Sequence, residues 1–290
     1  MKLYGILLLS LALIFGGCDF KDNSSGIPHI VKVNDFDLRQ LQDERSDTYD
    51  VKEVWVYSSQ DILGVFPLPA TIPYLDEDGN GVVDLTILAG IKANGIAATR
   101  TPYNLYEAES LSNEFIGGDT TVIETFQTQY INSAYVDMIE DFEQSSNLFH
   151  PNYISSADIV RTTNNAYVLD GVGSGLILLN DTMNQLFSAT QVEFINLPSN
   201  SGEIWLEYDY KSDNTFSIGL EAIGGSEDGR YPIYVHNSTG GEWKKMYLEL
   251  GPIVWTTPGS VGYEIILDAI LDPGEDSGYV VVDNFKIVHF

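Results

Sequence analysis

Residues 203–211 read EIWLEYDYK, with an apolar or aromatic residue at every second position. Alternate residues of a β-strand point to opposite faces, so this stretch predicts a strand with two distinct sides. One side carries Ile204, Leu206, Tyr208 and Tyr210, and the other carries Trp205, Glu207, Asp209 and Lys211. We therefore expect a half-buried antiparallel strand whose polar side faces solvent.

The same period of two recurs along the chain, and no stretch shows a convincing helical period. Loops rich in Gly, Asn, Ser and Pro separate the alternating stretches. The clearest expected strands are residues 54–57, 83–91, 122–126, 216–222, 242–250 and 280–290. This pattern predicts an all-β fold made of two β-sandwiches in tandem. We place an immunoglobulin-like sandwich at residues 29–134 and a jelly roll at residues 135–290.

Residues 1–18 read MKLYGILLLSLALIFGGC and end in the only cysteine of the chain. One lysine precedes an apolar run from Leu3 to Phe15, and two glycines follow that run. This order is typical of a secretory signal peptide, and the run is shorter than the roughly 20 residues that span a bilayer. We therefore expect residues 1–17 to be a signal peptide that is removed.

Residues 15–18, FGGC, resemble the lipobox of bacterial lipoproteins. In that family the cysteine is lipidated and becomes the new N-terminus, so the resemblance implies a lipid anchor on Cys18 in the outer membrane. Residues 18–28 are then the lipidated cysteine and a polar tether. Acidic residues soon after such a cysteine favour surface display in the Bacteroidota, and Asp19 and Asp22 stand there. The cell surface and the periplasmic face of the membrane both stay open as locations.

The charge balance excludes two classes of partner. The chain has 14 basic and 42 acidic residues, for a net charge of −28. Such a chain is repelled by nucleic acid and by anionic membrane surfaces. The acidic residues are spread through both halves, which indicates a solvated acidic surface. With Cys18 lipidated, no thiol is left for a disulfide, so stability must come from packing, or from packing with a hard cation such as calcium.

Residues 54–91 resemble PEGA-type domains, which are small sandwich modules of surface lipoproteins. The resemblance rests on a strand, a turn glycine, a Pro-Leu step and a further strand, found at residues 54–57, 64, 67–68 and 83–91. It implies an immunoglobulin-like sandwich and no catalytic activity.

Residues 76–81, DEDGNG, match the opening of a calcium-binding loop, in which alternate oxygens surround a cation at a glycine turn. The twelfth position of such a loop should supply a bidentate acid, and it is Ile87. The residues that follow also indicate a strand and not a helix. We therefore favour an acidic hairpin loop over a calcium site at this position.

Three short motifs of the second half are D-F-E at 141–143, W-K-K at 243–245 and V-D-N at 282–284. They look like jelly-roll carbohydrate-binding modules and galactose-binding-like domains, a resemblance that covers most of residues 139–290. In many such modules two acids share a structural calcium, and the matching positions are Glu143 and Asp283. The alternative for Asp283, an acid among apolar residues, is a hydrogen bond from the backbone of a neighbouring loop.

Glycan binding needs flat aromatic rings on an exposed surface, because the axial hydrogens of a sugar pack against the face of the ring. The candidate ligand-binding residues are Trp255, Trp243 and Tyr263. Trp255 comes first, because it lies in GPIVWTTPG between glycine and proline turns. Tyr231 and Tyr234 are also available at strand ends or in loops. The competing interpretation is that these rings pack in the core or at its rim.

Glu207 and Asp209 lie two residues apart on one strand face, which would place their carboxylates about 7 Å apart. The segment resembles the E-x-D-x-x-E strand of laminarinase-type glucanases, but the second Glu of that pattern is missing. A solvated strand face is therefore the favoured interpretation. No zinc-hydrolase or esterase spacing links the four isolated histidines, His29, His150, His236 and His289.

These features together predict a non-catalytic, lipid-anchored cell-envelope lipoprotein that binds glycan through its second sandwich. A structural or adhesion role in a surface protein complex is the alternative, and a glucanase is the less favoured third interpretation. Aromatic rings clustered on one concave face would favour glycan binding. A free sheet edge or an apolar patch would favour protein contacts.

Overall fold

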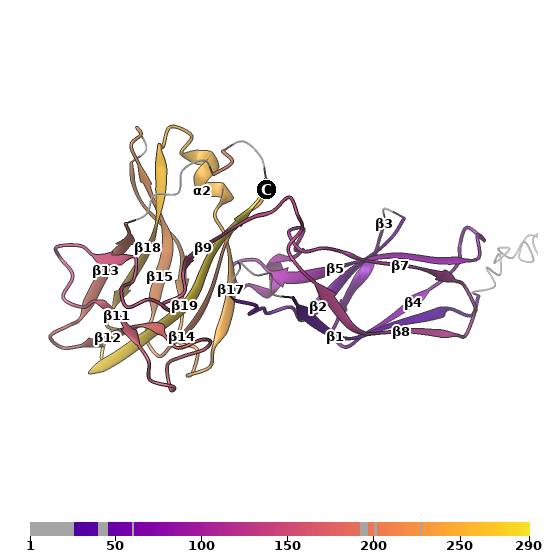
Figure 1. Cartoon of the computed structure of the whole chain (residues 1–290), viewed down its shortest axis with the longest axis horizontal. Helices are drawn as coiled ribbons and strands as arrows, with labels where there is room; N and C mark the ends of the chain where they lie inside the picture. The colour runs from indigo at the N-terminus through magenta and orange to yellow at the C-terminus, as the bar shows by residue number, and fades with distance from the viewer. Residues whose placement is uncertain (1–25, 40–45, 60, 192–196, 200–201, 227) are drawn as a thin grey trace, which may run out of the picture.

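The computed structural model describes residues 26–39, 46–59, 61–191, 197–199, 202–226 and 228–290. The strands of these residues form four sheets, arranged as two sandwiches, with one end of the first against the side of the second (Figure 1). The prediction of an all-β sandwich fold is confirmed. The expected signal peptide, Cys18 and the tether up to residue 25 lie outside the described residues.

The first sandwich has a three-stranded and a five-stranded sheet. Its strands are β1 (His29–Leu38), β2 (Glu53–Ser58), β3 (Asp61–Pro67), β4 (Ala70–Tyr74), β5 (Val82–Lys92), β6 (Arg100–Pro102), β7 (Glu109–Glu114) and β8 (Thr120–Thr128). One sheet has the order β4-β1-β8, in which β1 and β8 run parallel. The other has the order β3-β2-β5-β6, and β7 pairs with the remaining length of β5. A short 3-10 helix, η1 (Ala97–Thr99), precedes β6.

The second sandwich also has two sheets, with the orders β10-β13-β18-β15-β16 and β11-β12-β19-β14-β17. Its strands are β9 (Tyr135–Glu140), β10 (Phe149–Pro151), β11 (Ile159–Thr162), β12 (Ser174–Asn180), β13 (Gln185–Thr190), β14 (Ile204–Ser212), β15 (Phe216–Ile223), β16 (Gly229–His236), β17 (Lys244–Glu249), β18 (Gly262–Ile270) and β19 (Ser277–His289). β9 pairs with the C-terminal part of β19. The chain switches repeatedly between the two sheets, which is the connectivity of a jelly roll.

The period of two in the sequence becomes the inside and the outside of these sheets. On β5, Val83, Leu85 and Ile87 point into the first core, while the residues between them are more exposed. On β15, Phe216, Ile218 and Leu220 point into the second core. Burial of these apolar side chains is the main favourable term in folding, at about 25 cal/mol per Å² of apolar surface.

β14, the strand of residues 203–211, is buried on both of its faces. Its apolar face packs in the core of the second sandwich, and its other face is covered by the first sandwich. Trp205, Tyr247 and Val288, from three neighbouring strands of the second sandwich, belong to the core of the first. The prediction that the polar side of this strand faces solvent is therefore wrong. We call this contact surface between the two sandwiches the seam.

Hydrogen bonds from Asn94 to the backbone of the edge strand β17 also cross the seam. The amide of Asn94, just after β5, donates to the carbonyl of Tyr247 at 2.8 Å. The side-chain oxygen of Asn94 accepts from the amide of Glu249 at 3.0 Å. The first sandwich thus pairs with the edge of the second, so the edge of β17 is covered along this length.

Two loops differ from their predictions. Residues 76–81 connect β4 to β5, which belong to different sheets, so they do not form a hairpin. The Asp76 carboxylate accepts from the amides of Asn80 and Gly81 at 3.1 and 3.0 Å, as in a self-bonded turn. The segment around Trp255 is a six-residue helix, α2 (Gly251–Thr256), and not an open loop. In the described parts of the chain, no helix combines the length and the apolar character needed to cross a membrane.

Candidate functional site

The centre of the seam is a network of buried charged side chains. The Glu207 side chain is 0% exposed, and its carboxylate accepts from the Tyr103 hydroxyl at 2.6 Å. The Tyr130 hydroxyl lies 2.9 Å from both carboxylate oxygens. Burial, together with the nearby Glu207 charge, raises the pKa of both tyrosines well above its ordinary value, so both hydroxyls keep their protons and donate.

The same network continues from β14 to β17 and β19. The Asp209 carboxylate accepts from the Thr48 hydroxyl at 2.6 Å, and the Lys245 ammonium lies 3.6 Å from it. The Lys245 ammonium is also 3.7 Å from the Glu207 carboxylate. The buried Lys286 ammonium donates to the Ser46 carbonyl at 2.7 Å. Two carboxylates and two ammonium groups thus balance across the seam, as buried charges require. We call this network the closed half of the seam.

Beside the closed half, the seam opens into a cavity of about 410 Å³, which we call the aromatic cavity. Tyr49 lines it from the first sandwich, and Trp243 lines it from the second. The Tyr49 hydroxyl donates to the Phe36 carbonyl at 2.7 Å, and the two rings pack edge to face with their centroids 4.9 Å apart. The Tyr49 ring is therefore held in place. The remaining lining residues include Asp47, Asp50, Lys52, Lys244 and Lys245.

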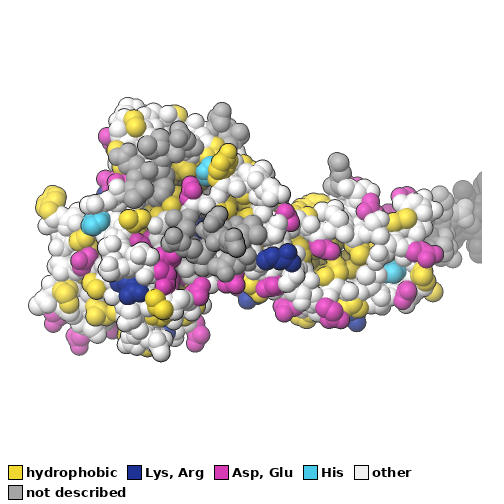
Figure 2. Space-filling model, in the orientation of Figure 1, with side chains coloured by type: hydrophobic (Ala, Val, Ile, Leu, Met, Phe, Trp, Pro, Cys, Tyr) yellow, Lys and Arg dark blue, Asp and Glu magenta, His cyan; other side chains and the backbone are white. Residues whose placement is uncertain are grey.

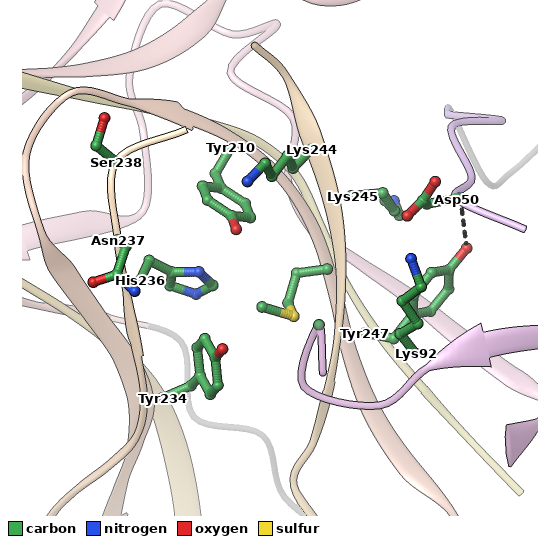
Figure 3. Close-up of a pocket in the computed structure, with 12 residues that line it drawn as sticks. Asp50, Lys92, Tyr210, Tyr234, His236, Asn237, Ser238, Lys244, Lys245 and Tyr247 are labelled. Carbon is green, nitrogen blue, oxygen red and sulfur yellow. Dashed lines mark hydrogen bonds between the residues drawn. The ribbon is translucent and has the colours of Figure 1, made fainter. Parts of the chain in front are cut away.

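A second cavity, of about 340 Å³, shares Asp50, Lys244 and Lys245 with the aromatic cavity. We call it the histidine cavity, and Figure 3 shows the His236 ring between the rings of Tyr210 and Tyr234. Ring centroids lie 4.3 Å apart for Tyr210 and His236 and 4.9 Å apart for Tyr234 and His236. Lys92, at the end of β5, lines the cavity from the first sandwich. The two cavities together form the open half of the seam.

His236 is a neutral, buried histidine on the wall of this cavity. It is 1% exposed, and its Nε2 atom lies 2.5 Å from the Tyr208 hydroxyl. Burial, with a smaller effect of Lys244, lowers the pKa of His236 to about 3. Burial also raises the pKa of Tyr208 well above its ordinary value, so that hydroxyl keeps its proton. Among the described residues, His236 Nδ1 has no hydrogen-bond partner.

The three predicted ligand-binding aromatic residues lie in different places. Trp243 lines the aromatic cavity. Trp255 is 41% exposed on α2, and β17 separates the two tryptophans by about 20 Å of strand. Tyr263 is 5% exposed, and its hydroxyl lies 2.9 Å from the Thr257 hydroxyl, so its ring offers no free face. The structure groups Trp243 with Tyr49 and not with the other two predicted residues.

The two predicted calcium ligands lie against consecutive residues of one loop. A Glu143 oxygen accepts from the amides of Val172 and Gly173 at 2.8 and 3.2 Å. An Asp283 oxygen accepts from the Ser174 hydroxyl at 2.6 Å. Burial raises the pKa of Asp283 to about 8, although the Ser174 hydrogen bond acts in the opposite direction.

These surroundings do not fit a calcium ion. Calcium takes six to eight oxygen ligands, whereas N–H and O–H donors surround these two carboxylates. In the part of the chain that the structure describes, no group of three or more His, Asp, Glu or Cys side chains is placed to hold a metal. Asp283 is hydrogen-bonded, but its donors are the Ser174 hydroxyl and the amide of the adjacent Asn284, and not the backbone of a neighbouring loop. Chelation tests directly whether calcium binds at these two residues.

In the acidic pair of the glucanase interpretation, Glu207 is closed to a substrate, whereas Asp209 reaches the wall of the aromatic cavity. Glu207 is covered by Tyr103 and Tyr130 from the first sandwich. Asp209, which is 3% exposed, is engaged by Thr48 and Lys245. Both carboxylates therefore hold the seam together and do not form an acid and base pair in a cleft.

Comparison with known proteins gives no family. No family model matches the chain, and no curated protein matches it. The solved structures similar to it include carbohydrate-binding modules of family 29. A CBM29-2 mutant complexed with cellulohexaose has a TM-score of 0.32 and 14% identity, covering 54% of this chain and 90% of its own. A CBM29-2 mutant complexed with mannohexaose has a TM-score of 0.33 and 15% identity, covering 54% and 91%. At these TM-scores the similarity assigns no function to this chain.

Sequence reasoning did not find Tyr49, Lys92, Tyr210 and His236 as lining residues. His236 is an isolated histidine in the sequence, and Lys92 lies more than half of the chain away from Lys244. One signal was present, because Lys244 and Lys245 are adjacent in a chain with only 14 basic residues. Figure 2 shows acidic side chains over both sandwiches, so a pair of lysines at one place was an unusual feature.

Proposed function

We propose that the protein binds glycan chains, without modifying them, in the open half of the seam. The observation that carries the proposal is the aromatic cavity, in which Tyr49 and Trp243 come from different sandwiches and meet carboxylates and ammonium groups. Aromatic faces pack against the axial hydrogens of sugar rings, and the charged groups hydrogen-bond to hydroxyls. The two cavities share three lining residues, so one chain of sugars can extend through both.

The size and rigidity of the site support this proposal. Volumes of about 410 and 340 Å³ fall in the range of small-ligand pockets. The Tyr49 ring is fixed by Phe36, and the closed half fixes the two sandwiches relative to each other. A site whose walls are already in place loses less conformational entropy when a ligand binds.

The test is a screen of neutral and acidic polysaccharides with the purified full chain, followed by titration of the best ligand. Trp243→Ala should weaken binding at least tenfold, because it removes one aromatic wall. Trp255→Ala is the matched control, since it removes an exposed tryptophan from α2, and it should change the affinity less than twofold. A tenfold loss of affinity in Trp255→Ala with little change in Trp243→Ala would place the site at α2. Binding to no polysaccharide would overturn the proposal.

The proposal includes a lipid anchor on Cys18, which would hold the site at the cell envelope. Its support is the order of residues 1–18, a lysine, an apolar run, two glycines and the only cysteine. Mass spectrometry of the N-terminal peptide from native membranes would show a lipid-modified cysteine. Cys18→Ser should release the protein from the membrane fraction. An unmodified cysteine on a membrane-free protein would contradict the anchor.

A role in a surface protein complex is the second candidate. It is favoured by exposed apolar side chains near the edge strand β11, where Val160 is 58% and Leu178 49% exposed around a cavity of about 340 Å³. Such patches are typical of protein contacts. Failure of every glycan to bind, together with loss of a crosslinked partner on Leu178→Asp, would support this function instead.

A further inference from the structure

The histidine cavity gathers positive charge in a strongly acidic protein. The chain carries 42 acidic and 14 basic residues. In this cavity the ratio is reversed, because Lys92, Lys244 and Lys245 face one carboxylate, that of Asp50. Figure 3 shows Lys244 beside Tyr210, on the side of His236 and Tyr234, and it shows Lys92, Lys245 and Asp50 on the opposite side, near Tyr247. The local charge therefore favours an anionic ligand.

Two of these charged groups already have partners. Lys245 lies between Asp209 and Glu207, at 3.6 and 3.7 Å. Asp50 forms an ion pair with Lys52 at 3.1 Å. Lys92 and Lys244, by contrast, form no ion pair with any residue that the structure describes. They come from different sandwiches and both line the cavity, so an anionic group bound there lies near positive charge that has no ion-pair partner.

His236 adds a neutral donor to the same cavity. The Tyr208 hydroxyl has no hydrogen-bond partner other than His236 Nε2 among the described residues. If Nε2 carried the proton, both the hydroxyl hydrogen and Nδ1 would be left without partners. The arrangement that satisfies more groups has Tyr208 donating to Nε2, and the proton of the neutral ring is then on Nδ1. Nδ1–H is a buried donor, and the acceptor it lacks is one that a ligand oxygen can supply.

We propose that the open half of the seam recognises an acidic glycan, with the carboxylate of a uronic acid residue attracted into the histidine cavity by the ammonium groups of Lys92 and Lys244 that line it. This inference rests on the proposed glycan-binding function and names its class of substrate. A carboxylate can form a charge-assisted hydrogen bond with either ammonium group. The acidic sugars should be spaced along a neutral chain, because the net charge of −28 repels a uniform polyanion. Charges more than about 8 Å away are screened at physiological salt, so the lysines of the cavity determine whether an isolated carboxylate is attracted or repelled.

The test compares one polysaccharide in two forms, glucuronoxylan and the same polymer after reduction of its carboxyl groups to alcohols. The full chain should bind the acidic form about tenfold more tightly at 50 mM salt, and this preference should shrink as salt rises. The double variant Lys92→Gln and Lys244→Gln should lose the preference and bind the acidic and the reduced polymer with equal affinity. Lys32→Gln is the matched control, since it removes an exposed lysine from β1, and it should keep the full preference.

Each other outcome overturns a defined part of the argument. Equal binding of both forms by the wild-type chain overturns the acidic-sugar inference and leaves the glycan-binding function intact. A preference that survives in the double variant places the cationic site elsewhere. Preference for a sulfated dextran over every carboxylated polymer overturns the assignment of the bound anion as a carboxylate. Binding of no polysaccharide overturns both proposals. Circular dichroism of each variant confirms that a lost preference does not come from unfolding.

Discussion

The closed and the open halves of the seam lie side by side and share strand β14, yet they differ in whether their charged and polar groups have partners. In the closed half, Glu207 and Asp209 meet Lys245, and Lys286 is held by a carbonyl of the first sandwich. In the open half, Lys92, Lys244 and His236 Nδ1 lack such partners among the described residues. The first arrangement fixes the position of the two sandwiches. The second leaves groups that a ligand can satisfy.

This difference separates two uses of buried polar groups. A buried charge costs several kcal/mol unless it is paired, so the closed half is tolerated only because its carboxylates, ammonium groups and hydroxyls match. A protonated His236 ring would carry the same cost, and the buried ring avoids it by staying neutral. Stability should therefore depend strongly on the closed half and weakly on the lysines of the open half.

The largest expected effect follows from Glu207→Gln. The change keeps the shape of the side chain but removes its charge, so Lys245 and Lys286 are left with one counter-charge fewer. We expect the free energy of unfolding to fall by about 3 kcal/mol or more, measured by urea denaturation. Asp84→Asn, on an exposed position of β5, is the control and should change it by less than about 0.5 kcal/mol. Equal effects of the two variants would contradict the assignment of the closed half.

The next effect is the pH dependence that His236 gives to stability. Its pKa is lowered from 6.5 to about 3 in the folded protein, so the unfolded chain binds the proton more readily. The stabilising contribution of the neutral ring is therefore present above pH 6.5 and is lost as the pH falls toward 3. The groups that face the ring are Tyr208, Tyr210, Phe216, Tyr234 and Lys244.

The measurement compares the wild-type chain with His236→Gln in urea denaturation at pH 7, 6 and 5. The wild-type chain should lose about 2 kcal/mol more than the variant over this range, at about 1.4 kcal/mol per pH unit below 6.5. A difference in unfolding free energy that is constant with pH would show that His236 is protonated normally. If the variant does not fold, NMR titration of the wild-type histidine decides the same point, because a neutral ring at pH 5 is expected.

The sequence predicted the strands well and the seam poorly, for a physical reason. Side-chain alternation decides which residues of a strand share a face, so β5, β14 and β15 and their inward residues could be recognised locally. Alternation cannot show what covers the other face. Glu207 is covered by Tyr103, 104 residues earlier, and Lys245 meets Thr48, 197 residues earlier. No local pattern carries such pairings.

The candidate site was partly foreseen. Trp243 was selected as an aromatic residue in a loop or at a strand end, and it lines the aromatic cavity. Its partners in the open half, Tyr49 and Lys92, belong to the other sandwich, so only the packing of the two sandwiches brings them together. Trp255 and Tyr263 were selected by the same criterion of residue type, which does not distinguish an exposed helix position or a core ring from a cavity wall.

A smaller effect tests the open half directly. Lys92→Gln and Lys244→Gln together should change the free energy of unfolding by less than about 0.5 kcal/mol, because neither ammonium group has an ion-pair partner among the described residues. Removing two like charges that face one cavity should even relieve a small repulsion. Urea denaturation at low salt measures the change. A loss comparable to that of Glu207→Gln would show that both halves of the seam are structural.

The smallest expected effect is that of chelation on the melting temperature. Glu143 accepts from two backbone amides, and Asp283 is held by Ser174 with its pKa raised to about 8, so neither carboxylate is arranged for a cation. A tightly bound structural calcium would add a stabilisation that grows with its concentration, and its removal would lower the melting temperature by several degrees. We expect the melting temperature to shift by less than about 1 °C on adding EDTA, and adding calcium chloride should not change it further. The reason is that hydrogen bonds from residues 172–174 already satisfy the carboxylates of Glu143 and Asp283. A larger shift that calcium reverses would show that the loop rearranges around a metal, and the Glu143 and Asp283 site would then have to be rebuilt from the metal-bound form.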